Sequence, residues 1–138
     1  MIIGYTTGVF DLFHIGHLNL LRNCKSMCEK LIVGVSSDAL VMYKHKKPII
    51  PFVERIEIIR ACKYVDVALM QEDMNKVEQV KKIKATKLFV GDDWYKSNKW
   101  ENYEKELKKI NCEVIYFPYT KNTSSTLINK TLEELKKK

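Results

Sequence analysis

The stretch Gly8-Val9-Phe10-Asp11-Leu12-Phe13-His14-Ile15-Gly16-His17 decides how this chain folds. The β-branched and aromatic residues of Ile2–Thr6 precede it and predict a strand, and an apolar pattern of helical period begins near Leu18. A strand therefore runs into a short loop, and the loop runs into a helix. The start of a helix carries unpaired backbone N–H groups and the positive end of a dipole, so this arrangement predicts an anion site.

His14 and His17 are three residues apart and share one face of the predicted helix start. Gly16 between them has no side chain, so a phosphate can approach the backbone. The pair could also be a surface accident or two ligands of a metal. A metal needs further ligands at a suitable spacing, and the third histidine, His45, lies among lysines. We therefore expect chemistry on a polyphosphate and no metal held by the protein.

The rest of the chain alternates β-branched runs with helical patterns, and no repeat or linker divides it. The alternation predicts an α/β fold: a Rossmann-like, doubly wound, parallel five-stranded sheet with helices on both faces, in a single domain over residues 1–138. The expected strands are Ile2–Thr6, Leu31–Ser36, Val65–Met70, Leu88–Val90 and Val114–Phe117. The expected helices are Gly16–Cys28, Phe52–Cys62, Asn75–Ile83, Lys99–Lys109 and Ser124–Lys136.

Ligands of such folds bind beyond the carboxyl ends of the strands, where the strand order reverses. The histidine loop follows the first strand, and three other segments follow later strands: Lys44–Pro48, Gly91–Trp94 and Thr120–Thr126. Together these segments offer imidazoles, ammonium groups, carboxylates and hydroxyls. That combination suits a nucleoside triphosphate.

Each of these segments also has an interpretation without a ligand. Lys44 and Lys46 could belong to a solvated loop tip, although lysines this close repel one another unless an anion lies among them. Asp92 and Asp93 could form a turn or a helix cap, or accept hydrogen bonds from ribose hydroxyls or a cytosine amino group. Trp94 could pack in the core or flank a ligand ring.

Two further features are open in the same way. The segment Asn122–Thr126 fits a helix N-cap, and its hydroxyl and N–H groups would also hold phosphates. Arg55 lies in a helical stretch, where it could form a surface ion pair.

The composition is that of an ordinary globular protein with a basic excess, because 24 Lys and Arg stand against 17 Asp and Glu for a net charge of +7. The excess suits anionic partners, and we expect nucleotides and phosphorylated metabolites rather than nucleic acid. No apolar run approaches a membrane span and no secretion signal is visible, so we expect a cytoplasmic protein that does not bind membranes. The four cysteines lack zinc spacing and are expected to be small, buried residues in a reducing compartment: Cys24, Cys28, Cys62 and Cys112.

With these motifs in view, the chain resembles the cytidylyltransferase family, and within it the small bacterial glycerol-3-phosphate cytidylyltransferases. The resemblance covers nearly the whole chain, and residues 8–17 are highly specific for this nucleotidyltransferase superfamily. The resemblance also rests on Lys44, Lys46, Glu54-Arg55, Lys63-Tyr64-Val65-Asp66 and Gly91-Asp92-Asp93-Trp94. The last of these points toward the glycerol-phosphate branch.

The final family motif, RTEGIST, differs in this chain, where it reads Tyr119-Thr120-Lys121-Asn122-Thr123-Ser124-Ser125. Tyr119 replaces the family arginine that is associated with phosphate binding, and Asn122 replaces the glycine. Lys121 restores a positive charge but not a bidentate fork. This difference does not remove the expected nucleotide site, but it leaves open which acceptor the protein uses.

The resemblance implies that CTP and a phosphorylated small molecule give a CDP-activated product, a precursor of cell-surface polysaccharide, and pyrophosphate, with Mg²⁺ accompanying CTP. Catalysis would be mostly positioning and charge stabilisation during in-line attack on the α-phosphorus. The implied catalytic residues are His14, His17, Lys44 and Lys46. The implied nucleotide-binding residues are Gly8, Val9, Phe10, Asp11, Gly16, Asp92, Asp93, Trp94, Thr120, Ser124 and Ser125, and the acceptor-binding residues are Arg55, Lys44 and Tyr119.

The acceptor stays open among glycerol 3-phosphate, phosphocholine or phosphoethanolamine, and phosphoglutamine, the precursor of capsule phosphoramidate. A non-catalytic nucleotide sensor is a different class of function, which the intact histidine pair and the two loop lysines disfavour. The segment Lys63–Asp66 matches one that lies near the dimer interface of similar enzymes, so we expect a symmetric homodimer.

Overall fold

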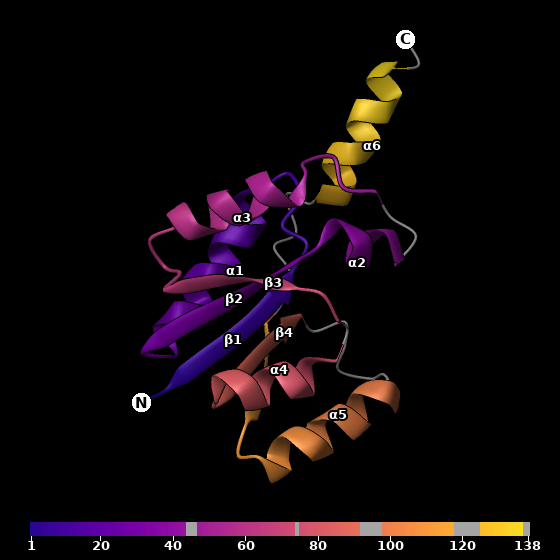
Figure 1. Cartoon of the computed structure of the whole chain (residues 1–138). Helices are drawn as coiled ribbons and strands as arrows, with labels where there is room; N and C mark the ends of the chain where they lie inside the picture. The colour runs from indigo at the N-terminus through magenta and orange to yellow at the C-terminus, as the bar shows by residue number, and fades with distance from the viewer. Residues whose placement is uncertain (44–46, 74, 92–97, 118–124, 137–138) are drawn as a thin grey trace.

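Five parallel strands form one sheet in the order β3-β2-β1-β4-β5 (Figure 1). This computed structural model describes residues 1–43, 47–73, 75–91, 98–117 and 125–136. The strands are β1 (Ile3–Gly8), β2 (Lys30–Ser36), β3 (Val67–Gln71), β4 (Lys87–Gly91) and β5 (Glu113–Phe117). The expected α/β, Rossmann-like, doubly wound fold is confirmed.

Helices cover both faces of the sheet (Figure 1). The helices of the described chain are α1 (Ile15–Ser26), α2 (Asp38–Tyr43), α3 (Phe52–Ala61), α4 (Lys76–Ile83), α5 (Asn98–Lys109) and α6 (Ser125–Lys136), of which α6 extends away from the sheet (Figure 1). On one face α1 and α3 bury a cluster that includes Leu21, Cys24, Ile56 and Ile59 against Val33 and Phe89. On the other face α4 and α5 bury a cluster that includes Val77, Val80 and Leu107 against Tyr5 and Leu88.

The middle strands are apolar almost throughout because both of their faces are covered. Tyr5 at the centre of β1 lies opposite Ile32 of β2 and opposite Leu88 of β4, and all three side chains are buried. The strand order reverses at β1, so the carboxyl ends of β1 and β4 open onto the switch point of the sheet. The loop with the two histidines begins there.

Each predicted strand and helix exists, with ends that differ by a few residues. The strand β1 extends to Gly8 rather than Thr6, so Gly8 ends a strand instead of lying in the loop. The strand β3 begins at Val67 rather than Val65, because the Val65 N–H donates to Cys62 O in the turn after α3.

One helix was not predicted. The helix α2 has only six residues, too few for a helical period to show in the sequence. Ser37 starts it, because its Oγ accepts a hydrogen bond from the Leu40 N–H at 3.1 Å.

The four cysteines are free; Cys24 and Cys112 are buried, whereas Cys28 and Cys62 are half-buried. Within the described ranges, no helix has the length and apolar character needed to cross a membrane.

Candidate active site

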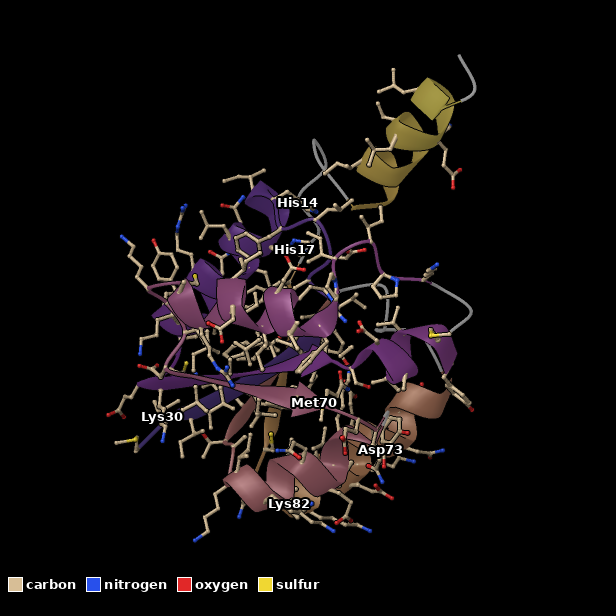
Figure 2. All side chains as sticks on the ribbon, turned by 45° about the horizontal axis from the view of Figure 1, so that its top comes forward. His14, His17, Lys30, Met70, Asp73 and Lys82 are labelled. Atoms are coloured by element: carbon tan, nitrogen blue, oxygen red, sulfur yellow. The ribbon has the colours of Figure 1, made fainter. Side chains whose placement is uncertain are left out.

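The loop after β1 ends in a helix cap made by the two histidines, at the carboxyl edge of the sheet and away from Lys30 at the start of β2 (Figure 2). His14 is the N-cap of α1, and its Nδ1 accepts a hydrogen bond from the Gly16 N–H at 3.0 Å. The backbone of His17 also donates to the His14 side chain, and the His14 N–H donates to His17 Nδ1 at 3.2 Å. A reciprocal box of this kind is usually made by Ser or Thr with Glu or Gln. The histidines therefore start the helix as well as face the site.

These hydrogen bonds fix where each ring carries its proton. A nitrogen that accepts has no hydrogen of its own, so a neutral imidazole that accepts at Nδ1 carries its proton on Nε2. Both rings accept at Nδ1, and their centroids lie 4.0 Å apart. The pair thus offers two adjacent Nε2–H donors, which suit anionic oxygens.

The sequence led us to expect open backbone N–H groups at this helix start, with Gly16 exposing one to a phosphate. In the structure the N–H groups of Gly16 and His17 are instead bonded to the His14 side chain. The physical reason is that an imidazole nitrogen without a proton is a hydrogen-bond acceptor, so His14 Nδ1 takes the place that a Ser or Asp oxygen usually has at an N-cap. An anion arriving at this turn therefore meets imidazole N–H donors where bare backbone donors were expected.

Burial keeps both imidazoles neutral near pH 7. Burial is the main cause that lowers the pKa of His17 to about 4, and repulsion from the protonated form of His14 lowers it further. The Asp11 carboxylate acts in the opposite direction and raises this pKa. Burial also lowers the pKa of His14. Neutral Nε2–H groups can donate hydrogen bonds but cannot take up a proton at that atom, so the arrangement suits charge stabilisation rather than general-base chemistry.

Two phenylalanines of the loop hold His17 in place. The Phe13 ring stacks on the His17 ring and the Phe10 ring meets it edge-on, each with centroids 5.5 Å apart. Phe10 and Leu12 adopt left-handed backbone conformations, with φ of 54° and 51°, which are uncommon for residues with a side chain. Gly8 makes room for this path, because a Cβ at Gly8 would lie 2.9 Å from the Phe10 ring. Within the described structure, Gly8 and Phe10 thus support the histidine.

Asp11 joins the histidine loop to another segment of the chain. Its side chain is buried, and its Oδ2 and Oδ1 accept hydrogen bonds from the N–H groups of Ile49 and Ile50 at 2.8 and 2.9 Å. Ile49 and Ile50 follow the lysine-rich segment. The position that the resemblance assigned to nucleotide binding therefore has both carboxylate oxygens engaged with backbone.

Arg55 is fully buried, so its interpretation as a surface ion pair was wrong. Its Nε donates to Ile50 O at 2.8 Å, and its Nη1 donates to Val9 O at 2.7 Å and to Ser36 O at 2.8 Å. Its Nη2 pairs with Asp38 Oδ1 at 2.6 Å. The guanidinium that was expected to contact the acceptor thus bonds four protein oxygens.

Asp38 is the residue near this site that sequence reasoning missed. Its carboxylate also accepts from the Phe52 N–H, at 3.1 and 3.2 Å. An acidic residue in the first turn of a short helix gives no sequence signal beyond that of a helix start.

Several predicted site residues lie outside the described residues: Lys44, Lys46, Asp92, Asp93, Trp94, Tyr119, Thr120 and Ser124. Ser125 begins α6. Two of these segments follow directly after strands that are parallel to β1. Gly91 ends β4 and Phe117 ends β5. Those strand ends lie at the same edge of the sheet as the histidine loop.

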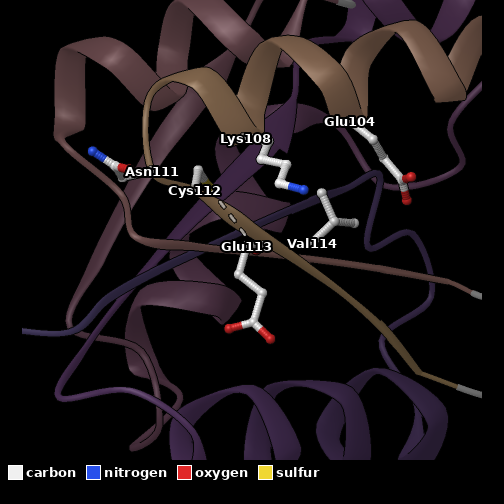
Figure 3. Close-up of a pocket in the computed structure, with 6 residues that line it drawn as sticks. All are labelled: Glu104, Lys108, Asn111, Cys112, Glu113 and Val114. Carbon is white, nitrogen blue, oxygen red and sulfur yellow. Dashed lines mark hydrogen bonds between the residues drawn. The ribbon is translucent and has the colours of Figure 1, made fainter.

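Other features of the described structure do not extend this site. A cavity of about 510 Å³ lies between α5 and β5, lined by Glu104, Lys108, Asn111, Cys112, Glu113 and Val114 (Figure 3). It opens at the amino end of β5, the sheet edge opposite the histidine loop. Among the described residues, no three His, Cys, Asp or Glu side chains gather as metal ligands would.

The chain is similar to known proteins both in sequence and in fold. A family model described as cytidylyltransferase-like matches residues 5–131. The chain is 34% identical to the glycerol-3-phosphate cytidylyltransferase of Bacillus spizizenii, over 94% of this chain and 96% of that protein. It is 36% identical to the FAD synthase of Thermococcus onnurineus, over 93% of this chain and 87% of that protein. The solved structure of a lipopolysaccharide core biosynthesis protein from Thermoplasma volcanium superposes with a TM-score of 0.73 at 28% identity, covering 89% of this chain and 99% of that one.

Proposed function

Because the chain belongs to the cytidylyltransferase-like family and is a nucleotidyltransferase, we propose that it transfers CMP from CTP to a small phosphorylated metabolite, with glycerol 3-phosphate as the best acceptor. The observation that carries the proposal is the capping box of His14 and His17, which leaves two neutral Nε2–H donors side by side. Donors fixed before the substrate arrives are the kind of group that stabilises charge developing on phosphate oxygens.

The chemistry needs little more than this. An oxygen of the acceptor phosphate forms a bond to the α-phosphorus of CTP while the bond from that phosphorus to the bridging oxygen of the β-phosphate breaks. Pyrophosphate leaves with the electron pair of that bond. The attacking oxygen is already anionic, so no base is required, and the histidine N–H groups donate to the phosphate oxygens on which charge grows.

In this proposal Mg²⁺ binds together with CTP. The described carboxylates near the histidines are engaged elsewhere, because Asp11 binds two backbone N–H groups and Asp38 pairs with Arg55. Mg²⁺ usually keeps several waters and binds through substrate phosphates with few protein ligands. The ion would neutralise charge on the leaving pyrophosphate.

The FAD synthase relatives favour a second candidate, an adenylyltransferase that makes FAD, because they are as similar to this chain as the cytidylyltransferases are. The segment Gly91–Trp94 is our reason to rank CTP and glycerol 3-phosphate first, since it resembles the glycerol-phosphate branch. The changed motif at Tyr119 keeps phosphocholine, phosphoethanolamine and phosphoglutamine as further acceptors.

A substrate panel tests the proposal. The full chain is incubated with CTP or ATP, Mg²⁺ and one acceptor at a time: glycerol 3-phosphate, phosphocholine, phosphoethanolamine, phosphoglutamine or FMN. Pyrophosphate release gives the rate, and mass spectrometry identifies the product. We expect the highest kcat/KM with CTP and glycerol 3-phosphate. Faster turnover of ATP with FMN would replace our proposal by the FAD synthase function, and tight CTP binding without turnover of any acceptor would indicate a nucleotide sensor.

We also propose a symmetric homodimer formed at the β3 edge of the sheet. No described strand pairs with the outer side of β3, and its Val67 and Met70 side chains are exposed. Beside it the half-buried Tyr64 ring lies close to the cations of Arg22 and Lys63, whose Cζ and Nζ atoms are 5.8 and 5.2 Å from the ring centroid. Apolar side chains on an unpaired strand edge favour pairing with a second copy.

A further inference from the structure

Arg55 and Asp38 form a link between chain segments that border the candidate site. We propose that this pair is a positioning device, which fixes the segment Ile49–Phe52 against the histidine loop and does not itself contact substrate. The inference rests on the proposed function, because it assigns these residues a part in the same transfer.

The contacts of Arg55 reach three segments from one guanidinium. Nη1 donates to Val9 O in the histidine loop and to Ser36 O at the end of β2. Nε donates to Ile50 O, in the segment that leads into α3. A planar guanidinium holds its donors at fixed angles, so these three segments cannot move independently while the bonds persist.

Asp38 binds both Arg55 and the segment that follows the lysines in sequence. It lies in α2, before Lys44 and Lys46 in sequence, and its carboxylate accepts from the N–H of Phe52, which follows them. This bond fixes the distance between two points of the chain that flank the lysine-rich segment.

Asp11 adds a second connection between the histidine loop and the segment Ile49–Phe52. Its carboxylate belongs to the histidine loop and accepts from Ile49 and Ile50, and the carbonyl of Ile50 in turn accepts from Arg55. The histidine loop and the segment Ile49–Phe52 are therefore tied by two buried side chains, those of Asp11 and Arg55, which meet at Ile50. Groups held this way arrive at the substrate already oriented.

The burial of Arg55 argues against direct contact with an acceptor. Its side chain is 0% exposed, whereas that of Asp38 is 44% exposed. Because no part of the Arg55 side chain is exposed, an acceptor phosphate could reach the guanidinium only if a neighbouring group such as Asp38 moved aside. The partial exposure of Asp38 also makes it a practical site for substitution, because removal of its side chain leaves no closed cavity.

The test uses Asp38→Ala, Asp38→Asn, Arg55→Lys and the double variant Asp38→Ala with Arg55→Lys. Displacement of positioned groups costs up to about 100-fold in rate, so we expect Asp38→Ala and Arg55→Lys each to lower kcat/KM by roughly 10- to 100-fold. The KM values for nucleotide and acceptor should both rise, and Asp38→Asn should restore part of the loss because its amide oxygen still accepts from Phe52. The kcat/KM of the double variant should be little lower than that of the less active single variant, since both residues act through one link.

The matched control is Arg60→Lys. Arg60 lies on the same helix α3 in an exposed ion pair with Glu57, and it should leave kcat, KM and stability unchanged. Amide hydrogen exchange gives a readout apart from activity: Asp38→Ala should speed exchange at Phe52, and Arg60→Lys should not.

Three results would overturn the inference. The first is a folded Asp38→Ala protein with faster exchange at Phe52 but unchanged kcat and both KM values, which would mean a structural role alone. The second is a rise of the acceptor KM alone in Arg55→Lys with no effect of Asp38→Ala, which would mean direct contact. The third applies if the wild-type chain transfers nothing to any acceptor, so that the proposed function fails. The dissociation constant of CTP is then measured by calorimetry. A value that is unchanged in both Asp38→Ala and Arg55→Lys would overturn the inference.

Discussion

At the scale of single residues, His14 and His17 have one task that the structure shows and one that we propose. Each Nδ1 accepts a hydrogen bond of the helix cap, and each Nε2–H is the proposed donor to the phosphates. The two tasks use different atoms of one ring, so substitutions can separate them. His14→Ala removes both, whereas His14→Asn keeps an oxygen that accepts the capping bond, because Asn is among the preferred N-cap residues.

We expect His14→Ala to lose about 1 kcal/mol of stability through the missing cap and to lower turnover by roughly 100-fold or more. His14→Asn should keep its stability and lose the same turnover. Thermal unfolding and pyrophosphate release measure the two effects. Asn75→Ala is the matched control, since Asn75 caps α4 through Val77 away from the histidines. It should lose stability and keep turnover, and near-normal turnover in both His14 variants would contradict the role of Nε2.

The lowered pKa of His17 makes stability depend on pH. The unfolded side chain takes up its proton near pH 6.5, but the folded one does so only at about 4. Between these values the unfolded state binds more protons, so the contribution of His17 is full above about pH 6.5 and is lost as the pH falls toward 4.

His17→Gln tests this dependence, because glutamine can still accept from the His14 N–H but does not titrate. The free energy of unfolding of the wild type should fall relative to that of His17→Gln as the pH drops from 7 to 4.5. Urea unfolding at a series of pH values measures the difference. Parallel pH curves for the two proteins would contradict the burial of a neutral His17.

At the scale of elements, the proposed site draws its residues from segments that follow parallel strands in the sequence. The loop after β1 carries the histidines, and the segment after β5, which precedes α6, carries Tyr119 in place of the family arginine. If Tyr119 belongs to a reshaped acceptor pocket, Tyr119→Arg should change which acceptor is used best. If only a phosphate clamp was lost, the substitution should tighten CTP binding and keep the acceptor order.

We expect the change of acceptor, because Asn122 departs from the motif as well. A bidentate contact to a charged group is worth about 1.5–3 kcal/mol, so either effect should be at least tenfold. The measurement is kcat/KM for glycerol 3-phosphate, phosphocholine and phosphoglutamine in both proteins. An unchanged order of acceptors would leave the lost clamp as the explanation.

At the scale of the whole molecule, the two edges of the sheet differ. The strand β3 exposes Val67 and Met70, at 37% and 43%, whereas β5 begins with the charged and exposed Glu113. Charges on an edge discourage pairing and apolar side chains favour it. The proposed dimer therefore uses β3.

Sedimentation at micromolar concentration should give a dimer for the wild type and a monomer for Val67→Lys with Met70→Lys. Glu113→Lys on the opposite edge is the control and should stay dimeric. Circular dichroism establishes that the variants are folded. A wild-type monomer, or a dimer that the β3 variant leaves intact, would refute this interface.

The sequence by itself determined the type and order of the elements, because these depend on local patterns, and it placed the proposed site after the first strand. Alternating β-branched runs and helical periods predicted the sheet, and the histidine motif between a strand and a helix predicted where ligands bind. The six-residue α2 left too little pattern to be found. The single domain and the dimer stay predictions.

Only the tertiary structure decided what the polar side chains of the site bind. Arg55 is far in sequence from Val9 and close to it in space, and a periodic pattern cannot reveal that a cation on a helix donates to carbonyls of another loop. The same holds for Asp11 with Ile49 and for the capping bonds that place the imidazole protons on Nε2. These contacts depend on how distant segments pack, and burial then sets the charge of each group, so the sequence could not assign the hydrogen-bond partners or the protonation of the residues it proposed.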